Sequence, residues 1–247
     1  MPRVLRAELL KLKRSKAVWG TVAVVASFAL MTVSMSHLFT AKGTQTTWSA
    51  TLELGPQFMA GWWGLMVFGL AAASMFGSEF SDGTATSMLT TAIRREYFVV
   101  AKMIVLALWS VGIVVVAIAG QCLAAVVLGA EGFAWGLVRD ALGDGLLIAF
   151  MFYLTLPVVA LLSMLGRGYI APMLYSTGLT ALSMTAGWLG WERWLPWAMP
   201  LTVAGGIAPP GVLDTSLPAW SWALSIALFV GGLAAVFVYV NRVDARA

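Results

Sequence analysis

Few side chains in this sequence carry the groups that enzymes use for chemistry. Cys122 and His37 are each the single residue of their type, which predicts neither an internal disulfide nor a His/Cys metal site. A thiol within an apolar stretch is disfavoured as a reactive thiolate, so we expect Cys122 to serve packing. The phosphate-loop pattern GxxxxGKS/T and the zinc pattern HExxH do not occur in the sequence. The chain is therefore expected to hold no catalytic residue, no metal and no cofactor of its own.

Polar groups within the apolar stretches are also scarce. Gln121 lies deep in such a stretch, where its amide is a candidate contact for a transported substrate. A hydrogen bond to a neighbouring helix is the favoured alternative, because polar side chains commonly play that role in membranes. Asp140 and Asp144 lie near one end of a stretch and not at its centre. A carrier driven by protons or sodium usually needs carboxylates at mid-depth, so this class is weakened.

The composition defines what surrounds these residues. The chain has 247 residues, of which 60% are hydrophobic and 11% charged, against about 25% charged in a soluble domain. Its mean hydropathy is +0.89. These values exclude a water-soluble globule and a nucleic-acid-binding arm, and they indicate a polytopic membrane protein.

We predict an all-α membrane protein, because a helix satisfies its backbone polar groups internally within lipid. Each of six apolar stretches is long enough to cross a bilayer. They form a single six-span transmembrane domain over residues 17–247. The predicted transmembrane helices cover residues 17–38, 58–76, 99–128, 141–165, 170–189 and 220–240.

Residues 1–16 are predicted to form an amphipathic helix that precedes the first span. Leu5, Leu9 and Leu12 recur at helical spacing, which gives one apolar stripe on a basic helix. Such a helix lies in the membrane surface, with its cations among the lipid phosphates. The stretch that follows is too long for a signal-peptide core, so we expect an uncleaved anchor. Its cations are Arg3, Arg6, Lys11, Lys13, Arg14 and Lys16.

The distribution of cations predicts the orientation in the membrane. With both termini inside, twelve of the fifteen Lys and Arg residues fall on inner segments. The remaining three are Lys42, Arg139 and Arg193. Because inner loops carry the excess of Lys and Arg, this asymmetry predicts a multi-pass protein of the inner (cytoplasmic) membrane with both termini cytoplasmic.

Two connections between the spans differ from ordinary loops. Residues 191–217, between spans five and six, are rich in proline yet remain apolar. We expect them to re-enter the membrane as short broken helices, in preference to a tryptophan-rich loop on the lipid surface. Residues 77–95, after span two, favour a short cytoplasmic helix, with Asp82 or Ser81 as its cap and Arg94 in its last turn.

The order of these parts resembles the permease subunit of ABC-2 type exporters, especially the small six-span bacterial kind linked to antibiotic-peptide and drug resistance. Residues 6–16, followed by Trp19, are similar to the elbow helix of that family. Residues 79–84, continuing through 89–95 to Lys102, resemble its acidic–Gly–Thr cytoplasmic segment. The proline-broken outer segment stands where these permeases have re-entrant helices. One departure is Ala92, where many relatives carry Pro.

The resemblance implies a division of labour between chains. Two permeases, the same or related, form the pathway, and two copies of a separate ABC ATPase bind ATP and Mg beneath them. The cytoplasmic segment would then be a coupling helix that docks in a groove of the ATPase. The implied coupling residues are Glu79, Asp82, Gly83, Thr84, Met88, Leu89, Ile93, Arg94 and Arg95.

Other interpretations stay open at this point. Asp82 is at least as well explained as a helix cap as by a contact with the ATPase. An ion-gradient-driven secondary transporter and a membrane assembly factor remain alternative functions. The substrate is not specified by any residue, although an apolar pathway favours lipids, hydrophobic drugs or amphipathic peptides.

Overall fold

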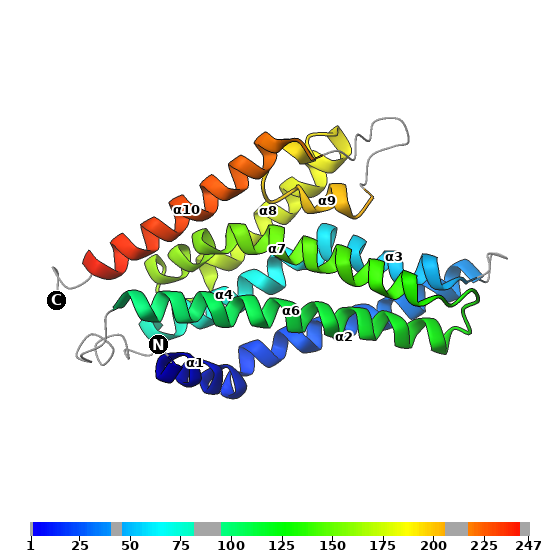
Figure 1. Cartoon of the computed structure of the whole chain (residues 1–247), viewed down its shortest axis with the longest axis horizontal. Helices are drawn as coiled ribbons and strands as arrows, with labels where there is room; N and C mark the ends of the chain where they lie inside the picture. The colour runs from blue at the N-terminus through cyan, green and yellow to red at the C-terminus, as the bar shows by residue number, and fades with distance from the viewer. Residues whose placement is uncertain (1, 41–45, 82–94, 206–216, 243–247) are drawn as a thin grey trace.

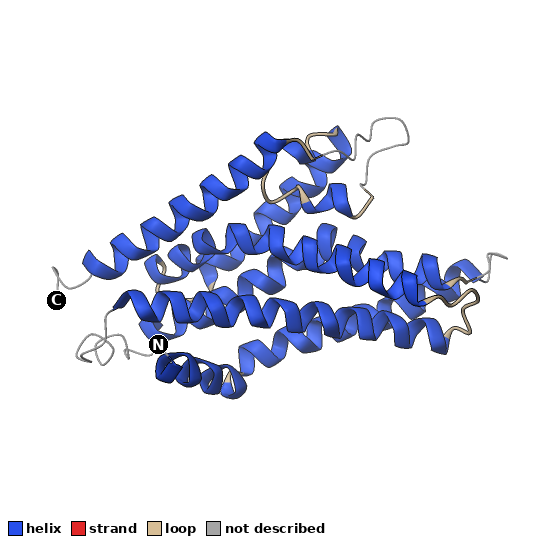
Figure 2. Ribbon diagram, viewed as in Figure 1, coloured by secondary structure: helices blue, strands red, loops and turns tan. Residues whose placement is uncertain are grey.

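The computed structural model describes residues 2–40, 46–81, 95–205 and 217–242. All regular elements in these ranges are helices (Figure 2). The helices are α1 Pro2–Arg14, α2 Lys16–Thr40, α3 Trp48–Phe58, η1 Met59–Trp63, α4 Gly64–Ser81, α6 Arg95–Val127, α7 Trp135–Leu165, α8 Ile170–Leu189, η2 Glu192–Trp194, α9 Pro200–Val203 and α10 Ala219–Arg242.

Four helical stretches in the described part are long and apolar enough to cross a membrane. They cover Trp48–Gly77, Glu96–Val127, Trp135–Leu165 and Ala219–Arg242. This finding confirms the all-helical membrane class. The other two predicted spans fall on α2, of 25 residues, and α8, of 20 residues. The count of six spans stays a prediction.

The second predicted span starts at residue 58, about ten residues later than the helical stretch that the structure shows. Instead of starting near residue 58, one continuous helical rod runs from Trp48 through α3, η1 and α4. The Thr47 side chain caps the start of α3 by accepting a hydrogen bond from the Ala50 amide, as N-cap residues do. Trp48 is only 9% exposed. The rod starts here because a cap and a buried tryptophan replace the loop expected from composition.

The rod changes to a π-helical turn at Met59–Trp63, where the Gly64 amide donates to the Met59 carbonyl. Pro56 lies just upstream and has no amide hydrogen to donate. A Cβ on Gly64 would meet the Met59 carbonyl and would lie 2.5 Å from Cε2 of Phe152 on α7. Glycine is therefore required at the end of this turn, because the wider turn and α7 both occupy the space of a side chain.

The core forms around α4 and α7, which pack against each other. Phe68 and Phe152 are fully buried between them, with ring centroids 6.0 Å apart. The helices α8, α10, α2 and α6 surround this pair (Figure 1). The centre of the bundle is thus apolar and closely packed.

The segment after α8 contains two short helices, η2 and α9, as expected for broken helices. Ala198 and Met199 are fully buried. The Ser183 hydroxyl of α8 donates to the Trp197 carbonyl at 3.2 Å, and the Ser225 hydroxyl of α10 donates to the Met199 sulfur at 3.0 Å. These contacts supply the protein cover that irregular backbone needs at membrane depth. Entry of this segment into the membrane stays a prediction.

Candidate functional site

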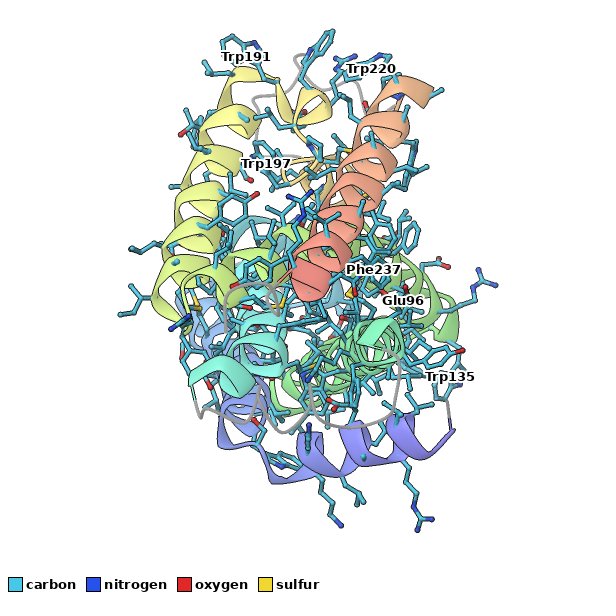
Figure 3. The ribbon with its side chains drawn as sticks, turned by 90° about the vertical axis from the view of Figure 1, so that its left-hand side faces the viewer. Glu96, Trp135, Trp191, Trp197, Trp220 and Phe237 are labelled. Carbon is cyan, nitrogen blue, oxygen red and sulfur yellow. The ribbon has the colours of Figure 1, made fainter. Side chains whose placement is uncertain are left out.

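Several helix ends gather at one end of the molecule, which we call the junction end. Figure 1 shows α1, the end of α4, the start of α6 and the end of α10 there. Figure 3 looks onto this end and shows α1 running crosswise to the long helices. The described residues on both sides of residues 82–94 therefore lie at the junction end.

The predicted coupling residues fall mostly outside the described residues. Glu79 lies on α4 and Arg95 begins α6, but their side chains are not described. The coupling role of the segment stays a prediction, and only its flanks can be analysed. The residues outside the described ranges are Asp82, Gly83, Thr84, Met88, Leu89, Ile93 and Arg94.

A buried ion pair joins three helices at the junction end. The Lys102 ammonium of α6 lies 3.0 Å from a Glu8 carboxylate oxygen of α1. It also donates to the Met75 carbonyl of α4 at 2.7 Å. Lys102 is 4% exposed and Glu8 is 5% exposed. Both charges are therefore largely removed from water, and each contributes to the compensation of the other.

The surroundings of this pair complete its polar contacts. The Lys11 ammonium, on the next turn of α1, lies 3.0 Å from the other Glu8 oxygen. The Lys102 ammonium lies 5.8 Å from the centre of the Phe76 ring, within the range of a cation–π contact. Glu8 thus binds one buried and one largely exposed ammonium, and it connects the surface of α1 to the interior.

The side of α1 that packs on α6 contains Val4 and Glu8, which are one turn apart and both buried. Leu9 is 40% exposed. Because the predicted leucine stripe faces the acyl boundary of the lipid and not the protein, this exposure does not contradict it, and the lipid contact of the stripe stays a prediction. The buried position of Glu8 is the feature that the charge pattern did not predict.

The surface cations of α1 remain on its outer side where they are described. Arg6 and Lys13 are exposed, and Lys11 is largely exposed while paired with Glu8. The side chains of Arg3, Arg14 and Lys16 lie outside what the structure describes. The role of these cations at a lipid surface stays a prediction.

A second contact fixes the corner between α1 and α2. The Trp19 indole donates to the Lys13 carbonyl at 3.0 Å and meets the Trp109 ring edge-on, with centroids 6.4 Å apart. The Trp109 indole donates to the Thr21 hydroxyl at 3.2 Å. Lys102 and Trp109 are seven residues apart on α6, so both face the same side of the helix. α6 therefore holds α1 at one point and the α1–α2 corner at another.

Gln121 is buried, with 3% of its surface exposed, against α3. Its Cγ lies 3.1 Å from the position of a Cβ on Gly55, and its Oε1 has no hydrogen-bond partner among the described residues. The favoured hydrogen bond from a neighbouring helix to this oxygen is therefore not formed. A role for Gln121 in a substrate pathway stays a prediction.

Several hydroxyls within the predicted spans bond to carbonyls of their own helices, and some of them also bond to other segments. Ser163 and Thr180 donate to carbonyls of their own helices, Ala160 and Ser176 respectively. Ser183 does both, because it also reaches the Trp197 carbonyl. A serine or threonine can satisfy its hydroxyl within the preceding turn, so no partner helix is needed.

The junction residues were only partly visible to sequence reasoning. Lys102 was noted as a cation at the entry to span three, but its pairing with Glu8 was missed. The available signal was that Glu8 is the single acid among the six cations of residues 1–16. An acid in a basic helix, with a lysine inside an apolar span elsewhere, favours a buried pair.

These features define a multi-pass helical membrane protein with an N-terminal crosswise helix joined to two span ends by a buried ion pair. Comparison with known proteins identifies the family. The family described as ABC-2 family transporter protein matches residues 4–183, from α1 into α8. The chain belongs to this family and is an ABC-2 type permease subunit.

One curated relative is similar over most of both chains. It is the bacitracin transport permease protein BCRB of Bacillus licheniformis, 21% identical over 182 residues. The alignment covers 73% of this chain and 85% of that protein. The ABC-2 family implies an ABC ATPase partner in general, which agrees with the absence of a phosphate-loop pattern from this sequence.

Proposed function

We propose that this chain is the permease subunit of an ATP-driven exporter in the inner (cytoplasmic) membrane. It moves a hydrophobic or amphipathic substrate, such as a drug, an antibiotic peptide or a lipid, out of the cell. Two copies of a separate ATPase bind ATP and Mg, and a second permease, the same or related, completes the pathway. The family match across both flanks of residues 82–94 is the observation that carries the proposal.

The proposed topology has six spans, with α2 and α8 added to the four long apolar helical stretches. The junction end faces the cytoplasm, because the excess of Lys and Arg falls on the segments assigned to that side. Both termini then lie in the cytoplasm. α1 rests in the membrane surface, where the exposed Arg6 and Lys13 meet lipid phosphates.

The proposed mechanism is mechanical. Residues 79–95 dock in a groove of the ATPase through Met88, Leu89 and Ile93. When the ATPases close on ATP, the segment moves and carries the ends of α4 and α6 with it. The two helices respond together, because Lys102 of α6 binds the Met75 carbonyl of α4. ATP binding thereby shifts the population between inward-open and outward-open arrangements.

The test replaces Met88 and Leu89 with Asp and measures ATPase copurification together with bacitracin resistance of cells that carry the complex. Charged side chains in an apolar groove should abolish both, because an uncompensated charge is costly to bury. The matched control exchanges the two residues, M88L/L89M, and should keep both. Full copurification and resistance in the Asp variant would remove this segment from the docking site.

The same assays separate the alternative functions. A secondary carrier would confer resistance after deletion of the ATPase gene and would respond to an ion gradient. An assembly factor would copurify with a larger complex but show no substrate-dependent phenotype. Either result would overturn the exporter proposal.

A further inference from the structure

We propose that Glu8 and Lys102 are positioning residues that make α1, the end of α4 and the start of α6 move as one body. The proposal deepens the proposed function and rests on it, because it states how motion of residues 82–94 reaches the elbow helix. It concerns the described flanks of that segment and their bond to α1.

The pair lies close to both ends of residues 82–94 along the chain. Met75 lies seven residues before Asp82, and Lys102 lies eight residues after Arg94. At about 1.5 Å of rise per residue, both are roughly 10–12 Å from the nearer end of residues 82–94. A single ammonium therefore binds α4, through the Met75 carbonyl, and α1, through Glu8, close to where the segment enters and leaves.

The pair is buried, which distinguishes it from a surface salt bridge. A salt bridge on the surface exchanges readily with water and fixes geometry weakly. Here both side chains are 5% exposed. Removing Glu8 takes a carboxylate away from a buried ammonium, whereas removing Lys102 leaves Glu8 with the ammonium of the more exposed Lys11. A buried pair is weak evidence for stability in itself, and its better-supported use is to specify one arrangement over others. The pair thus favours one register of α1 on α6.

The second contact point on α6 removes the remaining freedom of α1. Trp19 caps the Lys13 carbonyl and packs against Trp109, which itself bonds Thr21. Because this contact lies two turns from Lys102 on the same face of α6, α1 is held near its middle and at its end. Sliding or rotation of α1 would break both contacts together.

The experiment measures distances between spin labels in the full complex, in lipid nanodiscs, with Cys122 replaced by Ser. Labels on Arg6 and Tyr97, both exposed, span the junction between α1 and α6. A second pair on Tyr97 and the exposed Arg242 reports motion of α6 against α10. Distances are recorded without nucleotide and with ATP and vanadate.

In the wild-type background we expect ATP and vanadate to shift the Tyr97–Arg242 distance and to leave the narrow Arg6–Tyr97 distribution unchanged. Glu8→Gln and Lys102→Met should widen the Arg6–Tyr97 distribution. They should also reduce, by about tenfold, the factor by which nucleotide shifts the populations of the Tyr97–Arg242 distances, which is within the usual range for coupled sites. The conservative variant Lys102→Arg keeps a cation that can donate to both Glu8 and the Met75 carbonyl, and it should keep the distribution narrow. Size-exclusion chromatography of each variant identifies any that widens the distribution only because it misfolds.

The matched control is D140N, which breaks the exposed Arg139–Asp140 pair near the far end of the molecule. It should change neither distance. The proposal is overturned if Lys102→Met stays as narrow as wild type, or if nucleotide widens the wild-type Arg6–Tyr97 distribution. Failure of the proposed function gives a different result: the Tyr97–Arg242 distance ignores ATP, whereas Lys102→Met still loosens α1 without nucleotide.

Discussion

Substitution of Gly69 by Ala tests how closely α4 and α8 approach. A Cβ at this position would collide with the Ser176 hydroxyl oxygen and lie 3.2 Å from its Cβ. Because Ser176 is fully buried, it has little room to move away. Overpacking of this kind costs about 1–3 kcal/mol. At about 2–4 °C per kcal/mol for a chain of this size, we expect Tm to fall by roughly 2–12 °C.

The partner substitution Ser176→Ala makes the test specific. The Ser176 hydroxyl has no hydrogen-bond partner among the described residues, so removing it should be neutral or stabilising by up to about 1 kcal/mol. In the Ser176→Ala background the cost of Gly69→Ala should drop by about 1 kcal/mol, since the colliding oxygen is gone. Relief is incomplete because the Cβ of residue 176 remains.

The assay is thermal unfolding in detergent, followed by size-exclusion chromatography of the folded fraction. Gly178→Ala is the matched control on α8, the helix of Ser176, because a Cβ at Gly178 meets nothing within 4 Å. It should raise stability by up to about 1 kcal/mol through helix propensity. An unchanged Tm for Gly69→Ala, or an equal loss with and without Ser176→Ala, would refute the close contact between α4 and α8.

Three further changes are expected to alter stability in the same assay. Gly64→Ala should lower it by about 2 kcal/mol or more, because the new Cβ meets the Met59 carbonyl, which cannot move cheaply. Arg167→Gly should raise it by about 1 kcal/mol, since Arg167 has a φ of 47°. Ser221→Ala should lower it by about 1 kcal/mol, because the bond of 2.7 Å to the Arg193 carbonyl is lost. A Tm change of opposite sign would contradict the close approach at Gly64, the backbone strain at Arg167 or the hydrogen bond of Ser221, respectively.

The helical class was predictable because a lipid environment leaves few alternatives for apolar stretches. The range 170–189 coincides with α8, and 220–240 differs from α10 by one or two residues at each end. The start of span two was not predictable from hydropathy. It depends on the local Thr47 cap, which a hydropathy profile does not register, and on the burial of Trp48, whose ring packs on Phe133 far along the chain.

The candidate site was likewise predictable from the sequence only in part. A basic first helix and a short cytoplasmic segment follow from charge pattern and helical spacing. The burial of Glu8 does not, because it depends on an ion pair with a residue 94 positions away in the sequence. Lys102 supplies the opposite charge that compensates a carboxylate in the interior. An amphipathic projection treats every charge as solvated, so it cannot reveal such a pair.

The placement of polar contacts between helices favours a mechanism in which helices tilt. Near the junction end, Lys102 and two tyrosines reach main-chain carbonyls of other helices: Tyr153 bonds Met103, and Tyr239 bonds Met164. At the opposite end, the Ser183 and Ser221 hydroxyls bond carbonyls of the segment after α8.

Between these ends, the described α4–α7 interface is largely apolar, and several hydroxyls bond within their own helices. Apolar surfaces can shift without breaking directional bonds, whereas the ends move as bonded groups. Tilting about the middle therefore requires fewer broken polar contacts than separating the helix ends.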